Sequence, residues 1–316
     1  MIWALLHPIQ EHAAEGEEAA QEGFNAGEVI IEHISNTSIE DPLIHLPKIF
    51  GIDFSVTKHV FMLWLVAFAV FALVTFVVRR YIRQGGQVPS GLANVLEHVV
   101  LWIRDDIALP NVGKKWVNTW TPFILTFFVF IFSANLIGMI PIFEVLAVLN
   151  HYVFHFGHES FFGKVIHGGT TATANYNVTA GLAMITFGAI IAAGSRAHGV
   201  VTHFKNMVPH GLAWPVYIIL WPIEILGMFV KPFALTMRLA ANMTGGHIAL
   251  LAVMSLVFIF TEMFKTALAG VAVGLVVSVP LAVGISALEL IVVLVQAYVF
   301  TLLSAVFIGM AIHVHH

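Results

Sequence analysis

Runs of apolar residues long enough to cross a lipid bilayer recur along this chain, with polar segments between them. The clearest is VFMLWLVAFAVFALVTFVV at 60–78, where 19 consecutive residues carry no charge. An α-helix of about 20 apolar residues crosses the roughly 30 Å hydrocarbon layer of a membrane. Similar segments follow at 121–143 and 176–195. We therefore expect three membrane-spanning helices in this part of the chain.

Two longer apolar segments, 213–260 and 266–312, close the chain. Each exceeds the length that one perpendicular crossing requires. Either each segment contains two short spans, or each forms one steeply tilted helix that lies partly along the membrane. The sequence has no internal repeat of the kind common in secondary transporters. The pattern alone leaves both alternatives open.

The intervening segments are polar or mixed. Residues 88–110 combine apolar and charged positions at helical spacing, which is typical of a helix lying in the membrane interface. We expect the histidine-rich segment 144–175 and the shorter segment 196–212 to connect the spans at the surface. Residues 1–57 form a polar, acidic extension, so we divide the chain there and assign 58–316 to the membrane domain.

Composition supports this assignment. The chain has 316 residues, of which 59% are hydrophobic and 10% charged, whereas soluble domains carry about 25% charged residues. It contains no cysteine, which excludes disulfides, iron–sulfur clusters and thiolate zinc sites. The net charge of −4 does not indicate a nucleic-acid partner. We therefore expect an all-α integral membrane protein with about five membrane-embedded helices and an interfacial amphipathic helix.

Lysine and arginine predict the orientation of this domain. If the three early spans alternate in direction, eight basic residues fall on one side of the membrane and four on the other. Cytoplasmic loops carry the excess of Lys and Arg. The N-terminus is then periplasmic, and the C-terminus is cytoplasmic if each long segment crosses once. The larger group is Arg79, Arg80, Arg83, Arg104, Lys114, Lys115, Arg196 and Lys205, and the smaller is Lys48, Lys58, Lys164 and Lys265.

A few charged residues interrupt the two closing segments, where charges cost several kcal/mol and mark functional candidates. Glu224, Lys231 and Arg238 are seven residues apart, so they share one helix face. Asn242, four residues after Arg238, joins that face. Glu289 is the sole formal charge from 266 to 312.

The partner segment also presents a polar face, because Gln296 follows Glu289 by seven residues. Arg238 keeps its charge at physiological pH, so it can hold an electric field but cannot relay a proton. His247 titrates near neutrality, and burial can raise the pKa of a carboxyl group toward the same range. The chain thus separates one fixed cation from a titratable pair, His247 and Glu289.

Simpler interpretations exist for each of these residues. Arg238 can form a static ion pair with Glu224 or Glu289, although isolated ion pairs are rare in lipid. Lys231 can extend its ammonium group to the interface, and Glu224 can be solvated there. Taken alone, His247 is compatible with a hydrogen-bonded core histidine.

Four stretches resemble one membrane protein family. KPFALTMRLAANMTGGH, followed some forty residues later by ELIVVLVQAYVFTLLSAVFI, resembles the a subunit of the F-type ATP synthase. NLIGMIP at 135–141 and TATANYNVT at 171–179 are also similar to that family. The resemblance runs from about residue 55 to 312 and does not cover the acidic extension.

The resemblance implies a stator that lies beside a ring of c subunits, with b-type peripheral stalk and other ATP synthase subunits as further partners. Arg238 matches the essential arginine that faces the ring and separates two aqueous half-channels. Asn242 and Gln296 match polar positions near that arginine. The two closing segments then form a long tilted hairpin against the ring.

Three residues are assigned to the half-channels by the same resemblance. His247 and Glu289 match the positions of the channel from the outside, and Glu224 matches a position associated with the cytoplasmic exit. The expected location is the bacterial inner membrane. The expected role is proton translocation without catalysis by this subunit, and without a cofactor or metal.

Two other functions remain to be compared with this one. A self-contained proton-coupled channel or secondary transporter needs its own carboxylate near Arg238, and the sequence shows none that is obvious. A membrane metalloenzyme is the other, because His151, His155 and His158 have helical metal-ligand spacing. Such enzymes need several clusters on one side, whereas the other histidines fall on the opposite face in the predicted topology.

Overall fold

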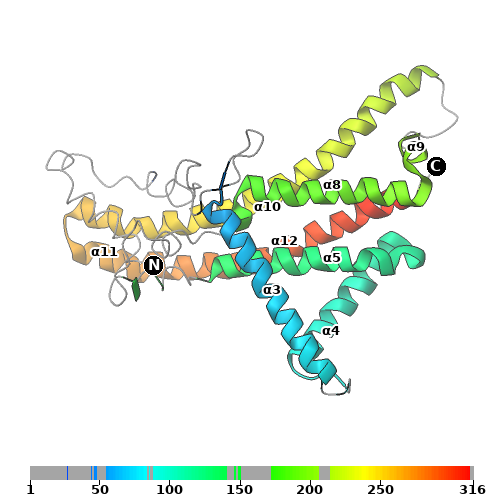
Figure 1. The fold of residues 1–316 in the computed structure, drawn as a ribbon. Helices are drawn as coiled ribbons and strands as arrows, with labels where there is room; N and C mark the ends of the chain where they lie inside the picture. The colour runs from blue at the N-terminus through cyan, green and yellow to red at the C-terminus, as the bar shows by residue number, and fades with distance from the viewer. Residues whose placement is uncertain are drawn as a thin grey trace. The chain divides into compact units, whose positions relative to one another are not determined.

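The computed structural model of the chain is predominantly helical in the part that it describes (Figure 1). It describes residues 27, 44, 46–47, 55–83, 85, 88–140, 146, 149–150, 172–205 and 214–313. Within these residues, five helices are long and apolar enough to cross a membrane. The prediction of an all-α, multi-pass membrane protein is therefore confirmed. Most of the acidic extension 1–57 and of the segment 144–175 lies outside the described residues, so the domain boundary stays a prediction.

The first predicted span is helix α3, Lys58–Arg83. It contains the whole of 60–78 and continues through the basic residues that follow, with Arg80 and Arg83 in its last turn. Before it, Ile44 and Val56 form an isolated antiparallel bridge, in which Val56 N–H donates to the Ile44 carbonyl at 2.9 Å.

The predicted interfacial helix and second span form one helical stretch, with a break at Gly113 in the interval between the two predicted segments. Helix α4, Leu92–Trp102, leads through the π-helix η1, Ile103–Ala108, into α5, Leu109–Met139. The chain changes direction at Gly113, where φ is 76° and ψ 165°, a conformation that glycine adopts most easily (Figure 1). α4 has no buried residue, as expected of an interfacial helix. α5 ends at Met139, since proline disfavours helix in the residue before it, here Ile140; residues 141–143 of the predicted span lie outside the described residues.

The third predicted span is helix α8, Tyr176–His198, preceded by the 3₁₀ turn η3, Ala172–Ala174. A turn at Gly199, with φ 86°, separates it from the short helix α9, Val200–Lys205. Most described side chains of α9 are exposed, as expected of a surface connection, but His203 is only 7% exposed, and residues 206–212 lie outside the described part of the chain.

The two closing segments are two long helical limbs of a hairpin. The first limb is α10, Trp214–Phe264, and the second runs through α11, Ala267–Val273, and η4, Gly274–Ser278, into α12, Val279–Ile312. The reversal occurs at Lys265, whose φ is 50°. At about 1.5 Å per residue, the 51 residues of α10 extend about 76 Å, more than twice the hydrocarbon thickness. The alternative of two short spans in each segment is therefore excluded.

The chain divides into two compact units. The first comprises Met1–Leu65, Ala134–Asn175 and Ala241–Val293, and the second Val66–Ser133, Tyr176–Ala240 and Leu294–His316. In the first, a Cβ on Gly270 of α11 would collide with Thr261 of α10, so glycine allows the two limbs to touch. In the second, α12 lies beside α5 and α8: Phe127 and Phe300 stack with centroids 5.6 Å apart, and the hydroxyl groups of Thr186 and Ser304 are 3.3 Å apart.

Candidate functional site

His247 and Glu289 lie next to each other in the first unit, on opposite limbs of the hairpin. Nδ1 of His247 is 3.8 Å from Oε1 of Glu289, and the side chains are 24% and 6% exposed. Gly246 makes this arrangement possible, because a Cβ at that position would lie only 2.8 Å from Oε1 of Glu289. The carboxyl group therefore packs against the backbone of α10 beside the imidazole ring.

A hydrogen bond joins the same part of α10 to the 3₁₀ turn η3, where a second polar contact lies next to it. Oγ1 of Thr244 donates to the carbonyl of Ala174 at 3.1 Å. Next to Ala174, Oγ1 of Thr173 donates to Oδ1 of Asn135, and neither of these residues is exposed. Because Thr244 precedes His247 by three residues, these bonds hold the turn of α10 that carries the imidazole.

Arg238 lies on the part of α10 that belongs to the second unit, and its side chain is exposed. Two exposed apolar side chains precede it along α10, Phe233 at 63% and Met237 at 40%. None of the carboxylates that the structure describes in this unit forms an ion pair with Arg238. Those carboxylates are Glu97, Asp105, Asp106 and Glu224.

The other predicted site residues have different surroundings. Asn242 is exposed on α10, four residues after Arg238, and Glu224 is half-buried. Gln296 on α12 is 3% exposed. Lys231, also on α10, places Nζ 5.4 Å from the centre of the Phe307 ring, a cation–π contact that explains its position without a role in chemistry.

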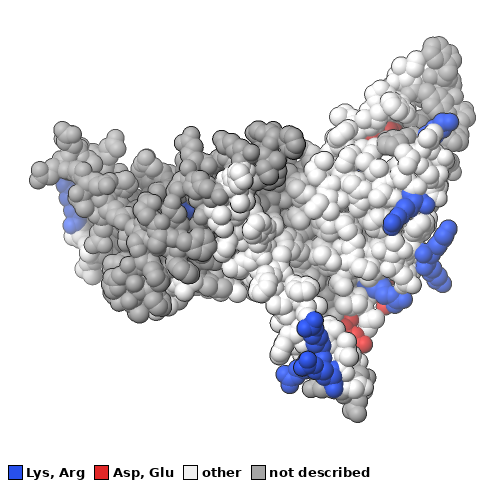
Figure 2. Space-filling view, viewed as in Figure 1, with Lys and Arg blue, Asp and Glu red and all other residues white. Residues whose placement is uncertain are grey.

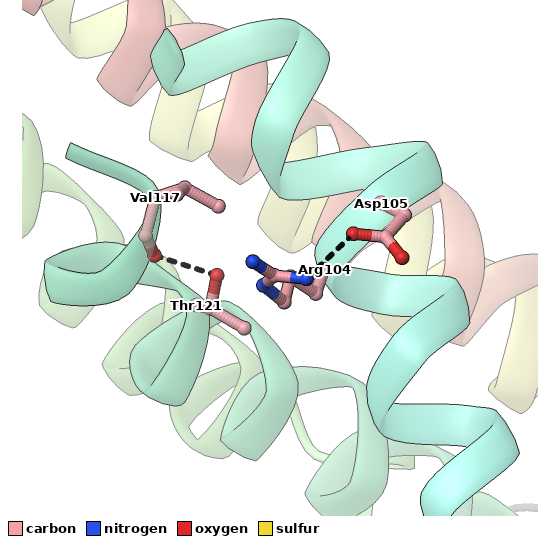
Figure 3. A network of polar contacts seen from close by, with 4 residues as sticks. All are labelled: Arg104, Asp105, Val117 and Thr121. Atoms are coloured by element: carbon pink, nitrogen blue, oxygen red, sulfur yellow. Dashed lines mark hydrogen bonds and ion pairs between the residues drawn. The ribbon is translucent and has the colours of Figure 1, made fainter. Parts of the chain in front are cut away.

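The clearest ion pair of the second unit lies elsewhere, between neighbouring residues of η1. Nη1 of Arg104 donates to Oδ1 of Asp105 at 3.1 Å, while Oγ1 of Thr121 donates within α5 to the carbonyl of Val117 (Figure 3). Both members of the ion pair are almost half exposed. Such surface pairs contribute little to stability, so we assign this one no functional role.

The residues that hold the His247–Glu289 pair were not predicted from the sequence. Asn135 and Thr173 belong to the two motifs that carried the family resemblance, and the GG dipeptide contains Gly246. Those motifs were the available signal, but periodicity could not assign them to the surroundings of His247.

The described residues contain no group of three His, Asp or Glu side chains that could hold a metal. The histidines on which the metalloenzyme interpretation depends, at 151, 155 and 158, lie outside the described part of the chain.

Comparison with known proteins identifies the family. Residues 60–309 match the family described as ATP synthase A chain. The chain is 40% identical to ATP synthase subunit a 2 of Chlorobium luteolum, over 98% of this chain and 82% of that protein. It is 40% identical to ATP synthase subunit a of Chloroherpeton thalassium, over 85% of this chain and 71% of that protein. For ATP synthase subunit a of Anaeromyxobacter dehalogenans the identity is 37%, over 98% and 77%.

The extent of these matches removes the alternative of a self-contained transporter, since the matched region includes all five long helices apart from a few terminal residues. The chain belongs to the ATP synthase A chain family, the membrane-embedded, proton-translocating stator subunits of the F-type ATP synthase.

Proposed function

We propose that this subunit guides protons to and from the carboxylates of a c-subunit ring through two half-channels, which Arg238 keeps apart. The observation that carries the proposal is the exposed side chain of Arg238 on the long apolar helix α10, without a carboxylate partner among the described residues of its unit. An unpaired charge in lipid is costly, so we expect an anionic group from another molecule to pair with Arg238. A ring carboxylate supplies that group each time a c subunit passes.

Proton entry from the outside is assigned to His247 and Glu289. The 3.8 Å between Nδ1 and Oε1 is longer than a hydrogen bond, and a small movement or one water molecule closes it. Because both groups titrate, either can accept a proton and pass it on. The neutralised ring carboxylate can then rotate into lipid, where the ionised form is strongly disfavoured.

Arg238 acts on the protonated ring carboxylate that returns from the lipid as the ring turns. Its fixed positive charge favours the ionised carboxylate, so it promotes proton release. It also repels protons, which prevents direct leakage between the half-channels. We assign Asn242 and Gln296 to the polar surroundings of the arginine, and Glu224 to the cytoplasmic exit. The subunit itself has no catalytic role in this mechanism.

The proposed orientation has the N-terminus in the periplasm and the C-terminus in the cytoplasm of a bacterial inner membrane. All eight basic residues assigned to the cytoplasmic side belong to the second unit, whereas Lys58 and Lys265 belong to the first. Figure 2 shows basic side chains in surface groups, one of them over the C-terminal end of α3. The other ATP synthase subunits are partners of this chain, and among them we propose direct contacts with the c ring and b-type stalk subunits.

Arg238→Ala tests the proposal in membrane vesicles that carry the assembled complex. We expect ATP-driven proton pumping and ATP synthesis to fall to background, and passive proton leakage to rise. Lys205→Ala is the matched control, because it removes an exposed cation from α9 of the same unit. Immunoblotting of the subunit in the membrane verifies assembly. Coupled ATP synthesis by assembled Arg238→Ala complexes would overturn the assignment.

A further inference from the structure

Two histidines hold the C-terminal end of α12 in the second unit. Nε2 of His198, at the end of α8, is 2.8 Å from the carbonyl oxygen of Ile312. Nε2 of His313 is 3.2 Å from the carbonyl oxygen of Val112. Because a carbonyl oxygen only accepts hydrogen bonds, each imidazole donates its Nε2–H. The two bonds join the last turn of α12 to α8 and to the break in α5.

Both acceptors are backbone carbonyls that lack the usual helical donor, the N–H group four residues later. For Ile312 the helix ends, and for Val112 the helix is broken. Ile312 is the last residue of α12, and the final four carbonyls of a helix have no intrahelical N–H partner. Val112 directly precedes Gly113, where the backbone leaves the helical conformation. Val112 is not exposed and Ile312 is 4% exposed, so water has little access to replace the lost donors.

The surroundings leave little space for another position of α12. The backbone of Gly309 packs directly on the carbonyl of Asn111, where any Cβ would collide. At the break, a Cβ on Gly113 would lie 3.2 Å from Nε2 of His313. A shift of α12 along its axis would therefore lose both hydrogen bonds and create backbone collisions.

We propose that His198 and His313 form a clamp that fixes the axial position of α12 and, through it, the position of Gln296. α12 continues without interruption between them, and Gln296 precedes Ile312 by 16 residues, or about 24 Å. The functional part of this inference rests on the role proposed above for Gln296. His198 and His313 act as positioning residues, since their contacts are to backbone carbonyls.

The position of α12 can be measured without measuring proton transport. The chain has no native cysteine, so an introduced pair forms the only possible disulfide within it. The hydroxyl groups of Thr186 and Ser304 are 3.3 Å apart, which makes Thr186→Cys with Ser304→Cys a reporter of how α8 and α12 are aligned. A disulfide requires Cβ atoms about 3.5–4.5 Å apart, so a displaced α12 forms it more slowly.

The reporter is combined with two pairs of clamp variants in vesicles that contain the assembled complex. His198→Leu with His313→Leu removes both donors, and we expect disulfide formation to slow by about fivefold for each lost hydrogen bond. His198→Gln with His313→Gln keeps an N–H donor on each side chain and should retain most of the rate. An unchanged rate in the leucine pair would overturn the clamp.

Proton pumping is then measured in the same histidine variants without the cysteine reporter. We expect the pumping rate to fall in the leucine pair, in parallel with the rate of disulfide formation. The glutamine pair should retain most of the pumping rate. Slow disulfide formation with normal pumping would refute the positioning role while leaving the clamp itself in place. Gln296→Leu separates the two proposals, because normal pumping by that variant would contradict the role of Gln296 and not the disulfide result.

Discussion

Glu289 on α12 and His247 on α10 meet across the hairpin, with Oε1 and Nδ1 3.8 Å apart and Gly246 beneath the carboxyl group. Three features make this contact: the turn at Lys265 that brings the limbs together, the missing side chain at Gly246, and the bond from Thr244 to Ala174. The pair combines low exposure with two titratable groups, which is the arrangement that a proton relay needs.

Gly246→Ala should impair proton transport without unfolding the hairpin. The new methyl group would lie 2.8 Å from Oε1 of Glu289, and the end of that flexible side chain can move away at little cost. The carboxyl group would then leave His247, and we expect ATP-driven proton pumping to fall by about 10- to 100-fold. Gly245→Ala is the matched control, because a Cβ there meets nothing within 4 Å. Equal pumping by the two variants would contradict the importance of this contact.

Glu289→Gln should slow proton entry and change its pH dependence. Glutamine keeps the shape of the side chain but cannot bind and release a proton at physiological pH. We expect pumping to fall by at least about tenfold, and the remaining activity to lose the titration of Glu289 from its pH profile. The measurement is the initial pumping rate across a pH series in vesicles. A reduced rate with an unchanged profile would indicate a structural role for Glu289 and not a relay.

Much of this architecture follows from the apolar pattern, and the exceptions have physical reasons. The early spans were predictable because runs such as 60–78 are uncharged and apolar over the whole length that a membrane-spanning helix requires. The exact position of the break, at Gly113, was not predictable, because it depends on a backbone angle and on a contact with His313 at the other end of the chain. Burial of His203 likewise depends on tertiary packing.

The candidate site likewise combines features that the sequence predicts with features that depend on tertiary packing. Helical spacing places Arg238 and Asn242 on one face, since that argument needs only a single helix. It cannot pair His247 with Glu289, because their contact depends on how the two limbs are aligned. Gly246 and Thr173 were recognisable only as parts of motifs, whose spatial relation to His247 required the fold.

Gly270→Ala should destabilise the hairpin. The added Cβ would collide with Oγ1 of Thr261 and lie 2.7 Å from the carbonyl oxygen of Val257, and the backbone cannot move as easily as a side chain. Forcing extra volume into such a contact costs about 1–3 kcal/mol. The thermal unfolding midpoint of the purified complex, with the amount of subunit in the membrane, measures the effect.

Gly284→Ala provides the comparison for Gly270, since a Cβ at Gly284 meets nothing within 4 Å and alanine favours helix. Thr261→Ala combined with Gly270→Ala should recover only part of the lost stability, because the Val257 carbonyl stays in place. If Gly270→Ala and Gly284→Ala behaved alike, the limbs would not be in contact at Gly270.

Acidification should loosen α9 through His203. Burial, followed by the nearby His198, lowers the pKa of His203 below its ordinary value of 6.5. Its ring packs against Gly194 of α8, where a Cβ would collide with it. When α9 opens, the imidazole regains its ordinary pKa and takes up a proton more readily than in the folded state. Folding of α9 is therefore most stable above about pH 6.5 and weakens as the pH falls below that value toward the lowered pKa.

Hydrogen exchange of Val200–Lys205 at pH 7.5 and 5.5, corrected for the intrinsic rate, measures this opening. We expect less protection at the lower pH in the native protein. His203→Leu removes the titration while keeping an apolar side chain against Gly194, so its protection should vary little with pH. His198→Gln removes the second cause of the lowered pKa and should reduce the pH effect without abolishing it. Equal protection of the native protein at both pH values would mean that His203 does not control the stability of α9.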